Sequence, residues 1–200
     1  MQIFEYGQKE IVYLKRRDKK LGEAIDKIGM IKREITPDSF TALVSSVVSQ
    51  QIAKKAAETV WNKLYTLFGN VTPESITQAD RSKIQGCGMS ERKAEYLKGI
   101  ADAAISGTID FKTLHTLTDE EIINRLSSLR GVGIWTAEML LIFSLCRPDV
   151  VSYKDLAICR GMMNLYNLKE LPKEKFERYR KRYSPYGSVA SLYLWELSVI

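Results

Sequence analysis

The 200-residue sequence is poor in the residues that build metal and redox sites. It contains three cysteines, far apart and without a Cys-x-x-Cys pair, and a single histidine, His115. A zinc knuckle, an iron–sulfur cluster and a histidine-based catalytic triad are therefore unsupported. We expect the cysteines to be reduced thiols and His115 to be structural or solvent-facing.

Long apolar runs are also missing. No run approaches the roughly 20 residues that a membrane span requires. The first residues, Met1–Tyr6, lack the basic and apolar regions of a signal peptide. We therefore expect a cytoplasmic protein, nucleoid-associated if bacterial, with no membrane partner.

Strand signals are weak as well, because alternating β-branched runs are short and apolar residues recur at helical spacing instead. An apolar stripe from Phe40 to Leu64 is interrupted at Gln50-Gln51, which predicts a helix end near residues 49–53. The segment 10–27 is helical in pattern and broken near Gly22. We predict an all-α fold of about ten helices, with residues 1–200 forming a single unit of two helical lobes.

The net charge of +6 is unevenly distributed, with basic clusters at residues 15–20, 92–93 and 173–182. Such clusters suit a polyanionic partner, but solvated helix faces explain each of them equally well. Charge alone does not decide between these interpretations.

The most informative segment is Leu129–Ala137, with the sequence LRGVGIWTA. Its two glycines allow positive φ and let the backbone approach a ligand closely. The apolar run that follows predicts a helix whose first amides can bind phosphate without a basic side chain. Asp155 comes about twenty residues later at a predicted helix start, where catalysis and a simple helix cap are the alternatives.

The LRGVGIWTA segment with Asp155 resembles the helix-hairpin-helix and downstream aspartate of the base-excision DNA glycosylase superfamily. Within that superfamily the chain resembles the 3-methyladenine DNA glycosylase II family. Residues 47–57, 93–97 and 183–195 agree with the same family, in the family's order. The resemblance implies a two-lobed fold with the active-site cleft between the lobes. We expect no N-terminal β domain of the kind present in some relatives, because few residues precede Gln50-Gln51, and no iron–sulfur cluster domain, because the cysteines are too few and too far apart.

The implied function is excision of alkylated purines, such as 3-methyladenine and 7-methylguanine, from double-stranded DNA at the start of base excision repair. The enzyme is expected to be a monomer that flips the base out and hydrolyses the N-glycosidic bond. Asp155 is the candidate catalytic residue, since a carboxylate stabilises an oxocarbenium-like sugar or activates water. Two alternatives stay open: a glycosylase for oxidised or deaminated bases, and a non-catalytic module that senses lesions.

Three residues are candidates for the substrate pocket: Trp135, Met139 and Tyr183. Trp135 stands where lyase-competent relatives have a Schiff-base lysine, which implies hydrolysis without strand cleavage. Its aromatic face suits a cationic alkylated base. Tyr183 matches a position where the family usually has tryptophan. Core packing is the alternative interpretation for all three.

The resemblance also marks candidate DNA contacts. Gln51 occupies the place of a polar plug for the space left by a flipped base, and the loop Met89–Glu91 occupies the place of an apolar wedge. Glu91 departs from the pattern, because an anion is unfavourable near DNA; Arg130 and Gly187 depart from it too. The expected DNA-binding residues are Gln51, Ser90, Glu91, Gly131, Gly133, Thr136 and Lys154.

No cofactor is expected to be required. The resemblance implies that the hairpin can hold a structural Na⁺ or K⁺ on the backbone carbonyls of Ser127, Leu129 and Val132. Carbonyl ligation leaves no side-chain motif, so this expectation comes from the resemblance alone.

Overall fold

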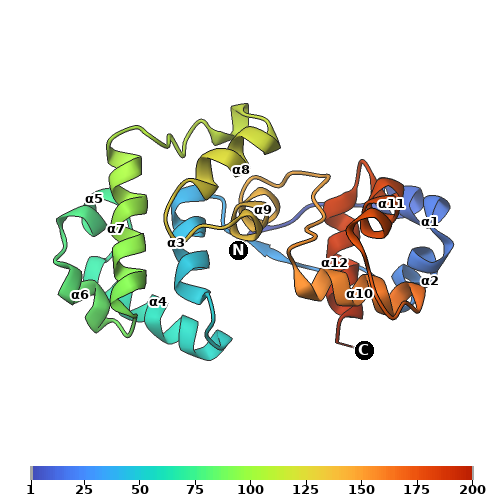
Figure 1. Ribbon diagram of the computed structural model, residues 1–200, viewed down its shortest axis with the longest axis horizontal. Coiled ribbons are helices and arrows are strands. Elements are labelled where there is room, and N and C mark those ends of the chain that lie inside the picture. Colours follow the sequence, from blue (N-terminus) through green and yellow to red (C-terminus); the bar gives the residue numbers. More distant parts are fainter. Residues whose placement is uncertain (1, 200) are drawn as a thin grey trace. The chain divides into compact units, whose positions relative to one another are not determined.

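The computed structural model describes residues 2–199, and over that range the chain is mostly helical (Figure 1). Two-residue strands, β1 (Gln2–Ile3) and β2 (Glu34–Ile35), form an antiparallel pair. The α-helices are α1 (Gln8–Arg17), α2 (Lys19–Ile28), α3 (Ser39–Ser49), α4 (Lys54–Phe68), α5 (Pro73–Gln78), α6 (Arg81–Gly86), α7 (Glu91–Ile105), α8 (Asp119–Ser127), α9 (Ile134–Phe143), α10 (Leu156–Tyr166), α11 (Lys173–Tyr183) and α12 (Gly187–Leu197). A 3₁₀ turn, Leu114–Thr116, precedes α8. The all-α prediction is confirmed.

One predicted boundary was wrong: the helical segment near the N-terminus breaks at Asp18 and not at Gly22. Asp18 leaves the helical conformation and its Oδ1 accepts a hydrogen bond from the Leu21 amide at 3.0 Å, so it caps α2. Gly22 lies inside α2 and is buried, with the backbone of Lys15 3.2 Å from where a Cβ would stand. The glycine therefore serves close helix packing rather than a turn.

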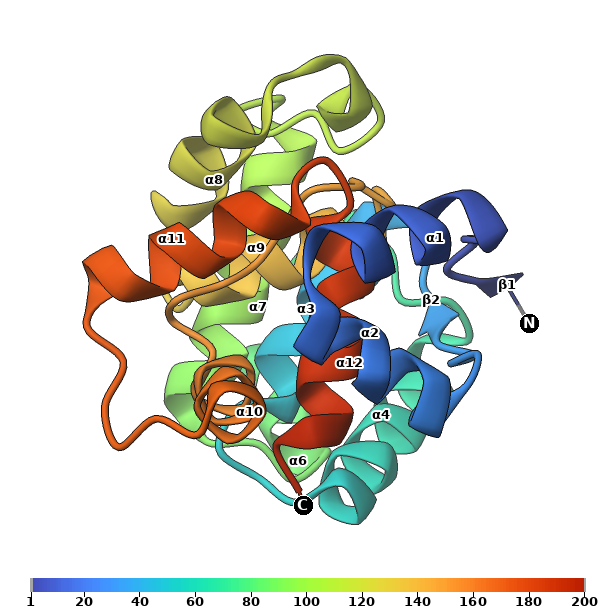
Figure 2. The same ribbon diagram turned by 90° about the vertical axis from the view of Figure 1, so that its right-hand side faces the viewer.

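The chain divides into two compact units, one formed by Met1–Ile35 with Leu141–Ile200 and the other by Thr36–Leu140. We call them unit 1 and unit 2. In unit 1, helix α12 packs against α2, α10 and α11, and Figure 2 shows these helices around it. The fully buried side chains of unit 1 include Leu14, Leu21, Phe176 and Tyr193.

Unit 2 is built on α7, which packs against α3, α5 and α6. Its core is formed by side chains that helical spacing places on inward faces, among them Leu43, Leu64, Leu97 and Ile100. α3 ends at Ser49 and α4 begins at Lys54, so the predicted break around Gln50-Gln51 is confirmed. Among residues 2–199, no helix has both the length and the apolar character needed to cross a bilayer.

Candidate active site

Asp155 is the N-cap of α10 in unit 1. Its Oδ1 accepts hydrogen bonds from the amides of Ala157 at 2.8 Å and Ile158 at 2.9 Å. The side chain is buried, although carboxylates are among the groups that proteins bury least. Asp155 therefore does cap the helix, as one of the two interpretations of the sequence expected. Only Oδ1 takes part in the cap, so Oδ2 can accept another hydrogen bond.

The second oxygen of Asp155 accepts a hydrogen bond from the indole Nε1 of Trp195 at 3.2 Å. Trp195 lies on α12, and its ring packs against Phe143 with centroids 5.4 Å apart. The Arg33 guanidinium lies 5.7 Å from the Phe143 centroid and 5.8 Å from that of Trp195. Asp155 is thus oriented through both oxygens, beside an aromatic pair that attracts cations.

Sequence reasoning assigned no role to Trp195. It lies forty residues from Asp155 on another helix, so only the packing of α10 on α12 brings the two together. A hydrogen bond across a helix pair leaves no local signal in the sequence. The residue appeared only inside the 183–195 segment that carried the family resemblance.

Tyr183 does not line a pocket, and this expectation is corrected. Its side chain is fully buried, and its hydroxyl shares a 2.8 Å hydrogen bond with that of Tyr166. Tyr166 in turn donates to Asp18 Oδ2 at 2.6 Å. Burial raises the pKa of both phenols. Packing and these hydrogen bonds hold Tyr183 in the core of unit 1.

Lys154, an expected DNA contact, precedes Asp155 in the sequence and is exposed.

The glycine hairpin lies in unit 2, between α8 and α9. Gly131 has φ +86°, and a Cβ there would stand 2.1 Å from Cδ2 of Tyr96. Gly133 lacks positive φ, contrary to expectation, and nothing lies within 4 Å of where its Cβ would be. Gly131 is therefore required by the fold, while the space beside Gly133 is open to a ligand.

The first two turns of α9 carry three candidate residues. Trp135 is 38% exposed, so part of this residue is accessible from solvent. Thr136 is buried, and its Oγ1 lies 3.4 Å from the Gln50 Nε2 that donates to it. Met139 is 9% exposed, which places it at the edge of the core. The structure therefore leaves Trp135 as the accessible aromatic of this helix.

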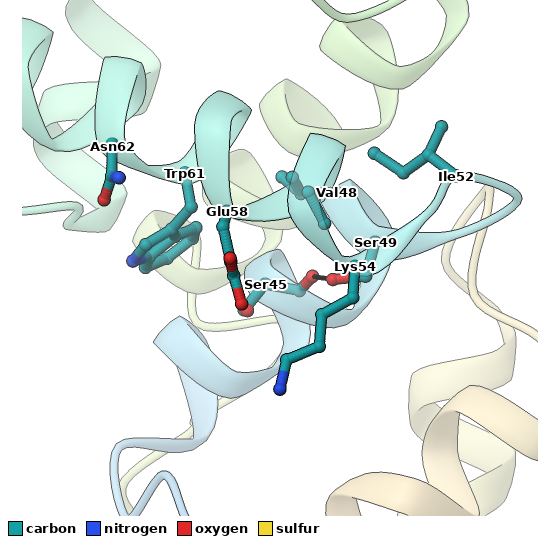
Figure 3. A pocket seen from close by; sticks show the side chains of 9 residues that line it. Ser45, Val48, Ser49, Ile52, Lys54, Glu58, Trp61 and Asn62 are labelled. Atoms are coloured by element: carbon teal, nitrogen blue, oxygen red, sulfur yellow. Dashed lines mark hydrogen bonds between the residues drawn. The ribbon is translucent and has the colours of Figure 1, made fainter.

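Gln51 is exposed on the turn between α3 and α4, and its φ is +58°. This turn borders a pocket of about 600 Å³ between the same two helices, which Figure 3 shows. The lining residues are Ser45, Val48, Ser49, Ile52, Lys54, Ala57, Glu58, Trp61 and Asn62. None of the expected pocket residues is among them, so this hollow is distinct from the expected substrate pocket.

The loop Met89–Glu91 begins α7 and offers no apolar wedge. Met89 is buried, and the Ser90 Oγ accepts a hydrogen bond from the Lys93 amide at 3.3 Å as the helix cap. Glu91 is exposed and lies 3.8 Å from the Arg81 guanidinium. The positive charge of Arg81 therefore offsets part of the repulsion between the Glu91 carboxylate and a DNA phosphate.

The three carbonyls expected to hold a cation belong to the hairpin and the end of α8. The Leu129 carbonyl accepts the Val132 amide at 3.1 Å, which closes the turn. Among residues 2–199, no group of three or more His, Cys, Asp or Glu side chains is arranged to hold a metal. The ligands that the hairpin offers to a cation are therefore backbone carbonyl oxygens, and hard cations prefer oxygen ligands.

Comparison with known proteins gave consistent matches. A family model described as "HhH-GPD superfamily base excision DNA repair protein" matches residues 44–185. DNA-3-methyladenine glycosylase 1 of Schizosaccharomyces pombe is 39% identical over 166 residues, covering 80% of this chain and 73% of that protein.

Two solved structures also resemble the chain closely. A DNA-3-methyladenine glycosidase from Bacillus halodurans has a TM-score of 0.87 and 33% identity, covering 99% of this chain and 93% of that one. A 3-methyladenine DNA glycosylase of S. pombe, solved in complex with abasic DNA, has a TM-score of 0.86 and 33% identity, covering 96% and 98%.

Proposed function

The chain belongs to the HhH-GPD superfamily of base excision DNA repair proteins, and on that premise we propose that it excises alkylated purines from duplex DNA. Relatives named as DNA-3-methyladenine glycosylases support this activity. The observation that carries the proposal is the buried Asp155 carboxylate, oriented by two backbone amides and an indole N–H.

Asp155 supplies the negative charge that the reaction needs. Breaking the bond between base and sugar leaves positive charge on the sugar, and a nearby carboxylate stabilises that charge or orients the attacking water. Because Asp155 is already fixed by its three hydrogen-bond donors, it needs little reorganisation as the charge develops. The oxygen of water bonds to the sugar carbon as the bond from that carbon to the base breaks; the base leaves with the bonding electrons, and the proton lost by water passes to solvent.

An alkylated purine suits this arrangement because its positive charge makes it a good leaving group. Little general acid catalysis is then required, in agreement with a chain whose only histidine, His115, is exposed on a 3₁₀ turn. The accessible face of Trp135 attracts a cationic base more than a neutral one.

We further propose that the enzyme is monofunctional. Schiff-base chemistry needs an amine at the hairpin, where this chain has Trp135. Lys154 is next to Asp155 in the sequence, but neighbouring residues at a helix start point in different directions, and Lys154 is exposed while Asp155 is buried. Water is therefore the expected nucleophile, and the product is an intact strand with an abasic site.

Duplex DNA is bound, in this proposal, by the hairpin and by the turn that carries Gln51. The first amides of α9 point to a phosphate, which can come close because the space beside Gly133 is open. Gln51 fills the space that a flipped base leaves. The same hairpin can hold a monovalent cation on the carbonyls of Ser127, Leu129 and Val132, and a monomer suffices for all these contacts.

Release of free base from a panel of defined lesions in duplex DNA tests the proposal. The panel contains 3-methyladenine, 7-methylguanine, 8-oxoguanine and hypoxanthine, and we expect release of the first two. Preferred release of 8-oxoguanine or hypoxanthine would replace the alkylpurine assignment. Tight binding to lesions with no base release would instead indicate a lesion sensor.

Asp155→Asn is the matched catalytic variant, because asparagine caps a helix as well as aspartate does but carries no charge. We expect single-turnover release to fall about 10²–10³-fold, with duplex affinity within a few-fold of wild type. Asp38→Asn is the control, since Asp38 caps α3 in the same way, its Oδ1 2.7 Å from the Thr41 amide. Wild-type release by Asp155→Asn would remove the catalytic assignment.

A further inference from the structure

The turn between α3 and α4 is held in a conformation that it would not adopt readily by itself. Gln51 has φ +58°, in the left-handed region that residues with a Cβ seldom occupy. The turn is exposed, and the last carbonyls of α3 need partners outside the helix. A left-handed residue in an exposed turn persists when its neighbours fix it.

Lys93 of α7 supplies one constraint. Its Nζ donates to the Val48 carbonyl at 2.8 Å and to the Gln50 carbonyl at 2.6 Å. A cation at the C-terminal end of a helix is also favoured by the helix dipole. Lys93 therefore holds the end of α3 and the residue before Gln51 with one ammonium group.

Gln50 supplies the second constraint. Its Nε2 donates to the Gly131 carbonyl at 3.0 Å, and lies 3.4 Å from the Thr136 Oγ1. One residue thus connects the turn to both sides of the glycine hairpin. The backbone carbonyl of Gln50 is held by Lys93 while its side chain holds the hairpin.

Helix α7 also contacts the hairpin directly. The Tyr96 ring packs on Gly131, and Glu95 pairs with the Arg130 guanidinium at 2.9 Å. The turn, α7 and the hairpin are consequently joined in a closed set of contacts inside unit 2. Lys93 and Gln50 form the link between the turn and the other two elements.

We propose that Lys93 and Gln50 are positioning residues, which fix the Gln51 turn and the hairpin as one preformed DNA-binding surface. They act through Gln51 and the hairpin amides, and they make no contact with the reacting base. A surface ordered before DNA arrives binds more tightly, because DNA then has less ordering to impose. This inference rests on the proposed function, since it assigns DNA to that surface.

Lys93→Met tests the inference, because it removes the ammonium and keeps an unbranched apolar side chain. Lys98→Met is a closely matched control: Lys98 lies on the same helix, and its Nζ donates to carbonyls at the end of α5, those of Ile76, Thr77 and Ala79. We expect Lys93→Met to bind an abasic-site duplex about 10-fold or more weakly, the loss that two charge-assisted hydrogen bonds imply. Lys98→Met should bind as wild type does.

The salt dependence of binding separates positioning from direct phosphate contact. If Lys93 only positions the turn, the log–log slope of affinity against salt concentration stays that of wild type in Lys93→Met. If Lys93 itself neutralises a phosphate, the slope becomes shallower by about 0.9 and the inference is overturned. Equal losses of affinity in Lys93→Met and Lys98→Met would also overturn it.

Gln50→Leu keeps the inference testable if Lys93→Met folds poorly, because the turn is outside the core. We expect it to reduce base flipping, measured by the fluorescence of 2-aminopurine opposite the lesion, with little change in melting temperature. Unchanged flipping would contradict the inference. Excision of lesions by the wild-type protein is measured separately and tests the proposed function. If the wild type excises no lesion, the proposed function is refuted, whatever the variants show.

Discussion

Gly131 and Gly133 stand one residue apart and are glycine for different reasons. Gly131 combines positive φ with a contact to the Tyr96 ring that leaves no room for a Cβ. Gly133 has ordinary φ and open space around it. Packing against Tyr96 requires glycine at position 131, whereas the space beside position 133 is open to a ligand.

Alanine at each position should therefore separate stability from binding. Gly131→Ala is expected to destabilise the protein by about 2–5 kcal/mol, from left-handed strain and displacement of the Tyr96 ring. Gly133→Ala should leave the melting temperature nearly unchanged but weaken duplex binding several-fold, since its methyl group occupies the approach of a phosphate. Urea unfolding and a binding titration measure the two effects. Full affinity in Gly133→Ala would show that no phosphate comes close there.

In the proposed mechanism, the residue at position 135 determines whether the enzyme cleaves DNA strands. With tryptophan there, borohydride should trap no covalent adduct between protein and DNA, and strands should break only after added alkali or heat. Efficient trapping by the wild type would mean that Lys154 or another lysine reaches the sugar.

Trp135→Ala is expected to lower excision of 7-methylguanine more than that of neutral hypoxanthine. The difference should be on the order of 1–2 kcal/mol, the strength of a desolvated cation–π contact. Rates for both bases, compared with wild type, measure it. Equal losses would make Trp135 a packing residue.

Local patterns predicted part of the site and tertiary contacts determine the rest. Asp155 at a helix start and Gly131 in a tight turn follow from short-range rules, and the structure agrees with both placements. Tyr183 was assigned by family position, but its fully buried ring belongs to a core whose membership no single segment reveals. Trp195 was missed because its partner comes from another helix.

At the scale of elements, α10 and α12 approach very closely at one point. A Cβ on Gly161 would stand 1.9 Å from the Leu194 carbonyl oxygen. α10 begins at Asp155, and α12 carries Trp195, so this crossing sets the distance between the carboxylate and the indole. The spacing of the helix pair therefore helps to position the proposed catalytic carboxylate.

Gly161→Ala should consequently force the two helices apart. We expect a loss of roughly 1–3 kcal/mol or more in the free energy of unfolding, since a backbone oxygen cannot move out of the way as a side chain can. Gly99→Ala on α7 is the control: nothing lies within 4 Å of its Cβ position, so alanine should stabilise the helix slightly. A Gly161→Ala protein as stable as wild type would contradict the crossing.

Helix boundaries were predictable where a cap or a break has a local signature. In the sequence, Thr118 followed three residues later by Glu121 is a capping-box pattern, and α8 begins there, with the Thr118 amide 2.8 Å from the Glu121 carboxylate. Near the N-terminus, Gly22 suggested a break that occurs at Asp18. The glycine is needed for packing against Lys15, and packing demands of this kind are not visible in helical periodicity.

At the scale of the whole molecule, a buried polar chain joins three helices of unit 1. Asp18 caps α2, and its Oδ2 accepts hydrogen bonds from Tyr166 of α10 at 2.6 Å and from Arg182 of α11 at 3.0 Å. Tyr183 extends the chain through its bond to Tyr166. Burial raises the pKa of both tyrosines, because it disfavours the phenolate.

The two tyrosines should make the protein sensitive to alkali. A raised folded-state pKa gives a contribution to stability that is complete below the unfolded value of about 10 and is lost as the pH rises above it. We expect stability to fall steeply above pH 10, and Tyr166→Phe to flatten that fall while costing stability at pH 7. Urea midpoints from pH 7 to 11 measure both; an unchanged alkaline slope in Tyr166→Phe would contradict the argument.

The division of the chain has a consequence for its synthesis. Residues of unit 2 leave the ribosome as one uninterrupted stretch, whereas unit 1 needs residues from before and after it. At roughly 5–20 residues per second, translation of the intervening stretch takes on the order of 5–20 s. During that interval α1 and α2 lack the partner helices α10–α12, which pack against them in the complete unit. We therefore expect the N-terminal helices to be the segment most open to chaperone binding until residues 141–200 have been synthesised.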